Sequence, residues 1–119
     1  MHELGIMTSV LDTVEQAATD AGATRVISIN LKIGEMTEAI EDALVFAFEA
    51  LQDLPEYALC KDAKLVINMV RPKSTCLECG AEYEHDRFDM LCPECGSFAT
   101  KLLAGRELQI DSMEVDLPD

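Results

Sequence analysis

Two short cysteine motifs are the part of the sequence whose residue types and spacing most directly indicate chemistry. They read Cys76-Leu77-Glu78-Cys79-Gly80 and Cys92-Pro93-Glu94-Cys95-Gly96, with twelve residues between them. Two residues between cysteines let a tight turn aim both sulfurs at one centre, and the glycine that follows relieves strain where the backbone turns back. The four thiolates predict one tetrahedral metal site, with Zn(II) bound by Cys76, Cys79, Cys92 and Cys95.

A site closed by four cysteines predicts a structural role for the metal, because catalysis needs an open coordination position. Iron is the alternative ion, since four thiolates also bind iron in rubredoxin-like electron carriers. Unligated thiols or disulfides are disfavoured, because two matched CxxCG units rarely arise by chance. The fifth cysteine, Cys60, is expected to be a small, partly buried hydrophobic residue.

The charge of the chain argues against the commonest function of zinc ribbons, which is nucleic-acid binding. Its 119 residues include 23 Asp and Glu but only 9 Lys and Arg, giving a net charge of −14. Such a surface repels phosphate backbones and suits basic protein partners or cation traffic. No apolar run approaches the length of a membrane span, and no secretion signal is evident. Five cysteines without such a signal fit a reducing cytoplasm.

The amino terminus is the second place where residue types indicate metal chemistry. A free terminal amine, the next amide nitrogen and the imidazole of His2 can chelate one divalent ion. Ni(II) and Cu(II) in tetragonal geometry are the usual ions that displace an amide proton. Taken alone, His2 also fits an ordinary exposed terminal residue, and Glu3 fits an acid that complements a helix dipole.

Hydrophobic periodicity predicts the elements that must position these residues. A helix is expected from Leu4 to Ala21, with Leu4, Met7, Leu11, Val14 and Ala18 as its apolar stripe. A strand is expected from Val26 to Ile33, with Ile27, Ile29, Leu31 and Ile33 on one face. A second helix is expected to be capped by Thr37, with Ile40, Ala43, Leu44, Ala47 and Leu51 as its stripe. Strands follow at 65–70 and 107–115, the latter with a bulge near Asp111 and Ser112.

These elements predict an α+β fold, with two helices packed on a small three-stranded mixed sheet. The cysteine module is inserted between the last two strands, which are expected to pair, so it forms a zinc-ribbon lobe at 73–104. About thirty residues are too few for an independent apolar core, so the ion must supply much of the lobe's folding free energy.

Four segments in combination resemble one protein family. They are Met1-His2-Glu3-Leu4, the strand exit Lys32-Ile33-Gly34-Glu35, the two cysteine motifs, and the closing strand Glu107-Leu108-Gln109-Ile110. Together they resemble the HypA/HybF family, the nickel metallochaperones of [NiFe]-hydrogenase maturation, over essentially the full chain. The resemblance implies a cytoplasmic, non-enzymatic carrier with Ni(II) as transient cargo and Zn(II) as a structural ion.

The resemblance also implies the roles of particular residues. Met1, His2 and Glu3 correspond to the nickel site, with His85 as a tentative further ligand, while the four motif cysteines hold the zinc. Residues 1–72 with 105–119 would form a nickel-binding α/β domain, and 73–104 a zinc-binding domain. The implied partners are a nickel-handling GTPase and the hydrogenase large-subunit precursor, and some members also serve urease.

Other interpretations remain open on the sequence alone. The chain also fits a zinc-ribbon docking module or the iron electron carrier mentioned above. His85 equally fits an exposed loop residue, and the acids Glu35, Glu38, Glu41 and Asp42 fit either a cation-attracting or partner-docking face or an ordinary solvated helix. No enzyme is expected, because neither of the two histidines has a nucleophile beside it.

Overall fold

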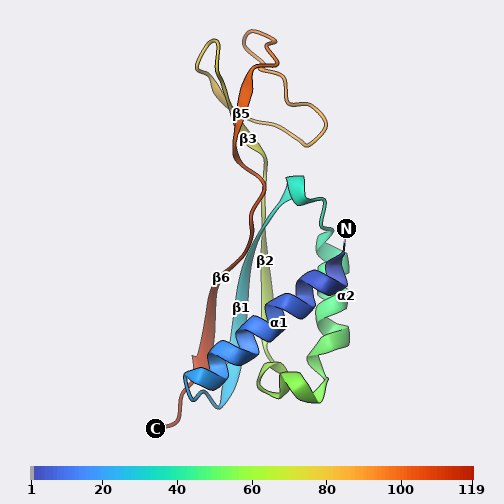
Figure 1. The fold of residues 1–119 in the computed structure, drawn as a ribbon, viewed down its shortest axis with the longest axis vertical. Helices are drawn as coiled ribbons and strands as arrows, with labels where there is room; N and C mark the ends of the chain where they lie inside the picture. Colours follow the sequence, from blue (N-terminus) through green and yellow to red (C-terminus); the bar gives the residue numbers. More distant parts are fainter. Residues whose placement is uncertain (1) are drawn as a thin grey trace.

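The structure, a computed structural model, describes residues 2–119. The molecule is elongated, measuring 57 × 28 × 16 Å, with a helix-covered sheet at one end and a lobe at the other (Figure 1). In chain order the elements are α1 (Glu3–Asp20), β1 (Arg25–Gly34), the 3-10 helix η1 (Glu35–Thr37), α2 (Glu41–Gln52), the 3-10 helix η2 (Pro55–Cys60), β2 (Lys64–Val70), β3 (Lys73–Cys76), β4 (Glu82–Glu84), β5 (Thr100–Ala104) and β6 (Leu108–Asp116).

The main sheet has the strand order β2-β1-β6, with β1 parallel to β2 and antiparallel to β6. The helices α1 and α2 cover one face of it (Figure 1). The prediction of two helices on a mixed three-stranded sheet is therefore confirmed. The predicted pairing of the last two strands is wrong, because β1 lies between β2 and β6. The strand with the most buried residues, β1, takes the central position, where neighbours on both sides satisfy its backbone.

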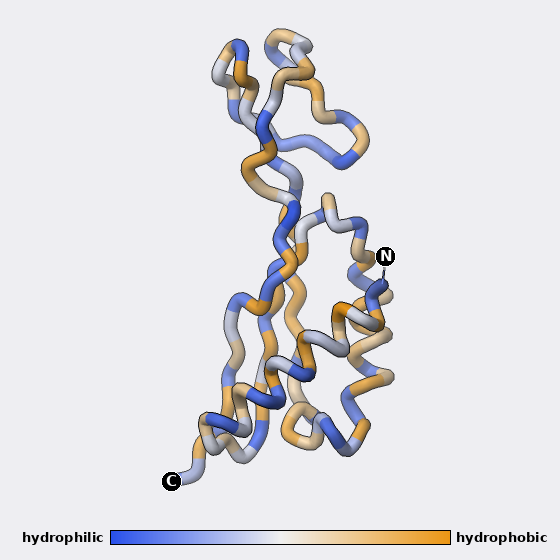
Figure 2. The backbone as a smooth tube through the Cα atoms, viewed as in Figure 1, coloured by the Kyte–Doolittle hydropathy of each residue, from blue (hydrophilic) through white to orange (hydrophobic). Residues whose placement is uncertain are grey.

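The core lies between the two helices and this sheet. Four predicted residues of α1 are completely buried, namely Met7, Leu11, Val14 and Ala18. Leu4 and Ile40 were expected in the helix stripes but are 58% and 60% exposed. The first turn of α1 lies beside the start of α2 rather than over the strands, and Ile40 precedes the first residue of α2 (Figure 1). Figure 2 shows apolar residues along both helices and the sheet strands.

Bulges set which residues of the central sheet face the core. The β1–β6 register passes from Asn30–Ser112 to Leu31–Ile110, so Asp111 is the extra residue and the predicted bulge is confirmed. A second register shift at Ile27 was not predicted. It moves Val26 into the core at 1% exposure and leaves Ile27 only partly buried, so strict alternation fails at the start of β1.

The predicted capping of α2 by Thr37 is wrong. The Thr37 hydroxyl donates to the Gly34 carbonyl at 2.7 Å and accepts the Ala39 N–H at 3.2 Å. These bonds close the 3-10 turn η1, and α2 begins four residues later at Glu41. The chain between β1 and α2 is therefore a separate turn rather than the first turn of the helix.

The lobe has a sheet of its own, with strand order β4-β3-β5 and antiparallel pairing throughout. These three short strands were not predicted individually. No lobe residue belongs to the buried apolar cluster of the main unit, and the buried residues within the lobe are Ser74, Cys76, His85 and Cys92. The absence of an apolar core within the described residues of the lobe agrees with the expectation that bound metal stabilises it.

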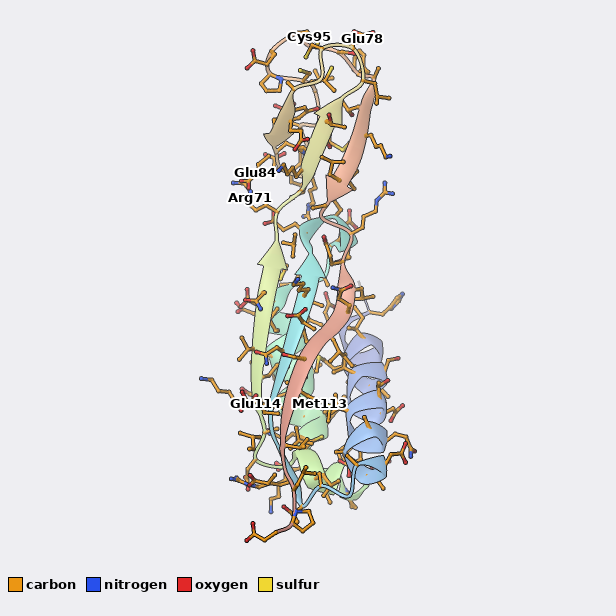
Figure 3. The ribbon with its side chains drawn as sticks, turned by 90° about the vertical axis from the view of Figure 1, so that its left-hand side faces the viewer. Arg71, Glu78, Glu84, Cys95, Met113 and Glu114 are labelled. Atoms are coloured by element: carbon orange, nitrogen blue, oxygen red, sulfur yellow. The ribbon has the colours of Figure 1, made fainter. Side chains whose placement is uncertain are left out.

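Two chain passages join the main sheet to the lobe at a waist, defined here as Gly34, Pro72 and Gly105. The strand β2 of the main sheet leads through it into β3 of the lobe, and β5 of the lobe leads back into β6 (Figure 3). The Gly34 N–H donates to Glu107 at 2.6 Å, and the Met36 N–H donates to Gly105 at 2.8 Å. The strand β3 begins at Lys73 and β5 ends at Ala104, and the division of the chain into a nickel-binding domain and a zinc-binding domain remains a prediction. No helix of the described chain is long and apolar enough to cross a membrane.

A side chain at Gly34 should disrupt the waist. A Cβ atom there would lie 2.0 Å from the Gly105 carbonyl oxygen, which is main chain and cannot rotate away. Gly34→Ala should therefore lower the free energy of unfolding by about 3 kcal/mol, measured by urea denaturation of the zinc-loaded protein. Gly5→Ala within α1 is the control, because its Cβ would lie 3.9 Å from the His2 Cβ, an ordinary van der Waals contact. Equal stability of Gly34→Ala and the native protein would contradict the waist contact.

Candidate metal sites

The lobe sheet places the two cysteine motifs as matching turns. In the first, the Cys76 N–H donates to Ala81 at 2.8 Å and the Gly80 N–H donates to Cys76 at 3.0 Å. The second repeats this pattern, with Cys92 donating to Ser97 at 3.2 Å and Gly96 donating to Cys92 at 2.8 Å. Gly80 and Gly96 both have positive φ, 78° and 73°, a backbone conformation that side chains disfavour. The predicted reason for the two glycines is confirmed.

The four motif sulfurs converge at the tip of the lobe, where Cys95 lies in Figure 3. All four ligand atoms lie within 4.8 Å of one another, and the Cys76–Cys95 and Cys79–Cys92 sulfur pairs are each 3.6 Å apart. Tetrahedral Zn–S bonds of about 2.3 Å place ligand sulfurs about 3.8 Å apart. A disulfide needs about 2.05 Å, and all five cysteines are free. The geometry therefore fits a four-cysteine metal site.

The electrostatics of the cluster also fit a divalent cation. The Cys79 N–H, 3.4 Å from the Cys76 sulfur, is the main cause that lowers the pKa of Cys76 to about 6. The Ser97 N–H lowers the pKa of Cys95, but the neighbouring Cys76 sulfur and burial outweigh it and raise that pKa to about 12. Once one thiol ionises, the others resist, because adjacent thiolates repel. A bound divalent cation would remove this repulsion.

The fifth cysteine, Cys60, is not part of the four-cysteine cluster. It is completely buried in the core of the main unit, more deeply than the partial burial expected. Burial is the main cause that raises the pKa of the Cys60 thiol to about 12, and the Glu15 carboxylate adds to the effect. The thiol is therefore protonated at neutral pH and acts as a small apolar side chain.

The amino-terminal residues lie at the start of α1, and Met1 lies outside the described residues. His2 is exposed and precedes the helix, and its carbonyl accepts the first helical bond, from the Ile6 N–H at 3.0 Å. Its side chain also borders an open, mainly apolar groove of about 470 Å³ between α1 and β6. The imidazole of His2 is thus accessible from solvent.

The Glu3 carboxylate has a partner on the other helix. Its Oε2 accepts the Ile40 N–H at 3.0 Å, immediately before α2. This bond is the main cause that lowers the pKa of Glu3, and the N–H of Glu3 itself adds to the effect. Nothing in the sequence indicated this contact, because it joins residues 37 positions apart.

His85 is buried at 7% exposure, not an exposed loop residue. Its Nδ1 faces the Asp86 carbonyl at 2.7 Å, and its Nε2 lies 2.7 Å from the Ser74 hydroxyl. A carbonyl can only accept, so Nδ1 carries the proton, and in the neutral ring the Ser74 hydroxyl donates to Nε2. Sequence reasoning missed Ser74, which comes within reach only through the register of β3 and β4.

The structure brings together the four predicted zinc ligands but not the three nickel-site residues that it describes. Among residues 2–119, the four cysteines are the one cluster of three or more His, Cys, Asp or Glu side chains close enough to hold a metal ion. His2, Glu3 and His85 form no such cluster. The nickel ligand set therefore stays a prediction.

The helices form an acidic layer, defined here as α1 and α2. Their sequences contain seven acids and no Lys or Arg, the acids being Glu3, Asp12, Glu15, Asp20, Glu41, Asp42 and Glu49. All nine basic residues of the chain lie elsewhere. Glu35 and Glu38 flank this layer in and after η1. The layer begins at the same end of α1 as the proposed nickel terminus.

Comparison with known proteins places this architecture in a family. A family model described as "Hydrogenase/urease nickel incorporation, metallochaperone, hypA" matches residues 1–115. The hydrogenase maturation factor HypA of Rhizobium leguminosarum bv. viciae is 36% identical over 115 residues, covering 97% of this chain and 99% of that protein. HypA of Methanococcus aeolicus is 38% identical over 117 residues, covering 92% and 93%.

Two solved structures also match this chain in fold. The solution structure of the Ni metallochaperone HypA from Helicobacter pylori matches with a TM-score of 0.68 and 26% identity, covering 99% of this chain and 100% of that one. A second solution structure of a HypA protein gives 0.70 and 27%, covering 97% and 96%. The family model and the titles of these structures thus define the class of protein as a metallochaperone rather than an enzyme. The chain belongs to the HypA family, which confirms the resemblance seen in its sequence.

Loss of one ligand tests the dependence of the lobe on metal. Cys79→Ser should abolish stoichiometric zinc and unfold residues 73–104, because no apolar core remains to hold them. The expected result is lost amide dispersion in the lobe and retained dispersion in the main sheet, measured by NMR alongside metal content. Cys60→Ala, which removes a cysteine outside the cluster, should keep its zinc. A folded lobe in metal-free Cys79→Ser would refute the dependence.

Proposed function

We propose that this protein binds Ni(II) at its amino-terminal segment, Met1, His2 and Glu3, and delivers it for maturation of [NiFe]-hydrogenase. Structural Zn(II) on the four cysteines keeps the lobe folded. The observation that carries the nickel proposal is the placement of His2 directly before α1. Amide N–H groups at a helix start have no intrahelical acceptor, so a metal can displace their protons without breaking the helix.

The chemistry of this segment suits a carrier. The terminal amine, amide and imidazole nitrogens must lose or lack a proton before they can bind Ni(II). The affinity of the segment for Ni(II) therefore falls as the pH falls. The exposed position of His2 lets a recipient replace these ligands one at a time, without opening a buried cage. We leave His85 out of the proposed set, because a metal would have to displace its bond to Ser74.

We propose that the partners are a nickel-handling GTPase and the hydrogenase large-subunit precursor, in the cytoplasm. Relatives of this chain are named hydrogenase maturation factors. The acidic layer favours a basic face on the partner, since it presents seven acids and no base. Exposed Leu4 and Ile40 offer apolar contact beside the nickel terminus. Urease, which the family description includes, is a second proposed client of the same site.

Calorimetric titration of Ni(II) into untagged, zinc-loaded protein tests the terminal site. We expect one equivalent in the native protein and none in His2→Ala, which removes the imidazole. A peptide extension ahead of Met1 should have the same effect, because it converts the amine into an amide.

His85→Gln is the matched control, since it alters the only other histidine. It should keep one nickel equivalent and its zinc. Unchanged nickel binding in the extended protein would refute a terminal chelate. Loss of nickel in zinc-loaded His85→Gln would instead assign His85 to the site.

A further inference from the structure

The start of α2 lacks an N-terminal cap from its own segment. Ile40 occupies the N-cap position and its side chain cannot accept a hydrogen bond. Thr37 is committed to Gly34 and Ala39. Three positions into the helix, where a Glu or Gln can reach back to the N-cap N–H, the chain has Ala43. The Ile40 N–H must therefore find an acceptor elsewhere.

That acceptor comes from α1. The Glu3 carboxylate lies 3.0 Å from the Ile40 nitrogen, in the geometry of a capping-box acid supplied by a different helix. The first turn of α2 already carries Glu41 and Asp42, which repel a third carboxylate. The hydrogen bond must outweigh this repulsion.

We propose that the Glu3 carboxylate is the N-terminal cap of α2 and holds the amino-terminal segment against that helix, as a positioning residue rather than a nickel ligand. This inference rests on the proposed terminal nickel site. With Glu3 anchored, the first turn of α1 is already ordered when the chelate forms. Without the anchor, the first turn of α1 frays and binding must also order it.

A ligand role for the same carboxylate predicts the opposite behaviour. Coordination would draw Glu3 away from Ile40, so nickel binding would expose the Ile40 amide. Under the proposal, nickel leaves that amide protected. The two roles also differ in their tolerance of Gln, whose side-chain oxygen can still accept the Ile40 N–H but is a poor replacement for a carboxylate ligand.

The test compares Glu3→Ala, Glu3→Gln and the control Glu41→Ala, all untagged and zinc-loaded. Hydrogen exchange of the Ile40 amide, followed by NMR without nickel, should be roughly fivefold faster in Glu3→Ala. It should stay close to native in Glu3→Gln and in Glu41→Ala, which removes a first-turn acid that does not bond Ile40. Unchanged exchange in Glu3→Ala would overturn the cap.

Calorimetry with Ni(II) then separates positioning from coordination. Glu3→Ala should bind one equivalent roughly fivefold more weakly, and Glu3→Gln should restore near-native affinity. An equal, large loss of affinity in both variants would make the carboxylate a ligand and refute the positioning role. If the native protein binds no Ni(II), the proposed function fails, while the exchange measurement still decides the cap.

Discussion

The close approach of two glycines at the waist is the constraint on which the arrangement of the molecule depends. Gly34 ends the central strand of the main sheet, and Gly105 lies on the chain returning from the lobe. Their main-chain atoms are too close for a side chain at Gly34, and Gly105 has φ of 121°. The main-chain N–H groups of Gly34 and Met36 donate hydrogen bonds to the carbonyls of Glu107 and Gly105 on the returning chain, and these bonds stabilise the contact. The direction in which the lobe extends is therefore set by backbone geometry.

The two ends of the molecule hold together by different physical means. The main unit buries apolar side chains from both helices and β1, and partly buried apolar side chains of β2 and β6 pack against them. The lobe buries two cysteines, a serine and a histidine, none of which provides an apolar core. In place of hydrophobic contacts, the lobe contains the four-cysteine cluster, whose geometry fits a metal ion, and the Ser74–His85 hydrogen bond. One chain thus combines a unit with an apolar core and a lobe whose buried side chains lie in or near a candidate metal site.

Local sequence patterns identified the features that depend on neighbouring residues in the chain. The helix stripe of α1, the bulge at Asp111 and the clustering of the four motif cysteines follow from periodicity, register or motif spacing. The features that were missed depend on contacts between distant segments. The burial of His85 follows from the β3–β4 register, and the capping of α2 follows from Glu3 rather than nearby Thr37. The central position of β1 likewise required knowledge of which strands pair.

Negative charge is distributed unevenly over the molecule and is densest on the acidic layer. The helices α1 and α2 carry seven acids and no Lys or Arg, whereas in the rest of the chain nine Lys and Arg partly offset the remaining acids. An approaching protein with a positive patch experiences a torque that turns this layer toward it before contact. Productive encounters are then more frequent than random collision allows, and added salt shortens the range of the effect. A transient carrier thereby gains speed of association without tight binding.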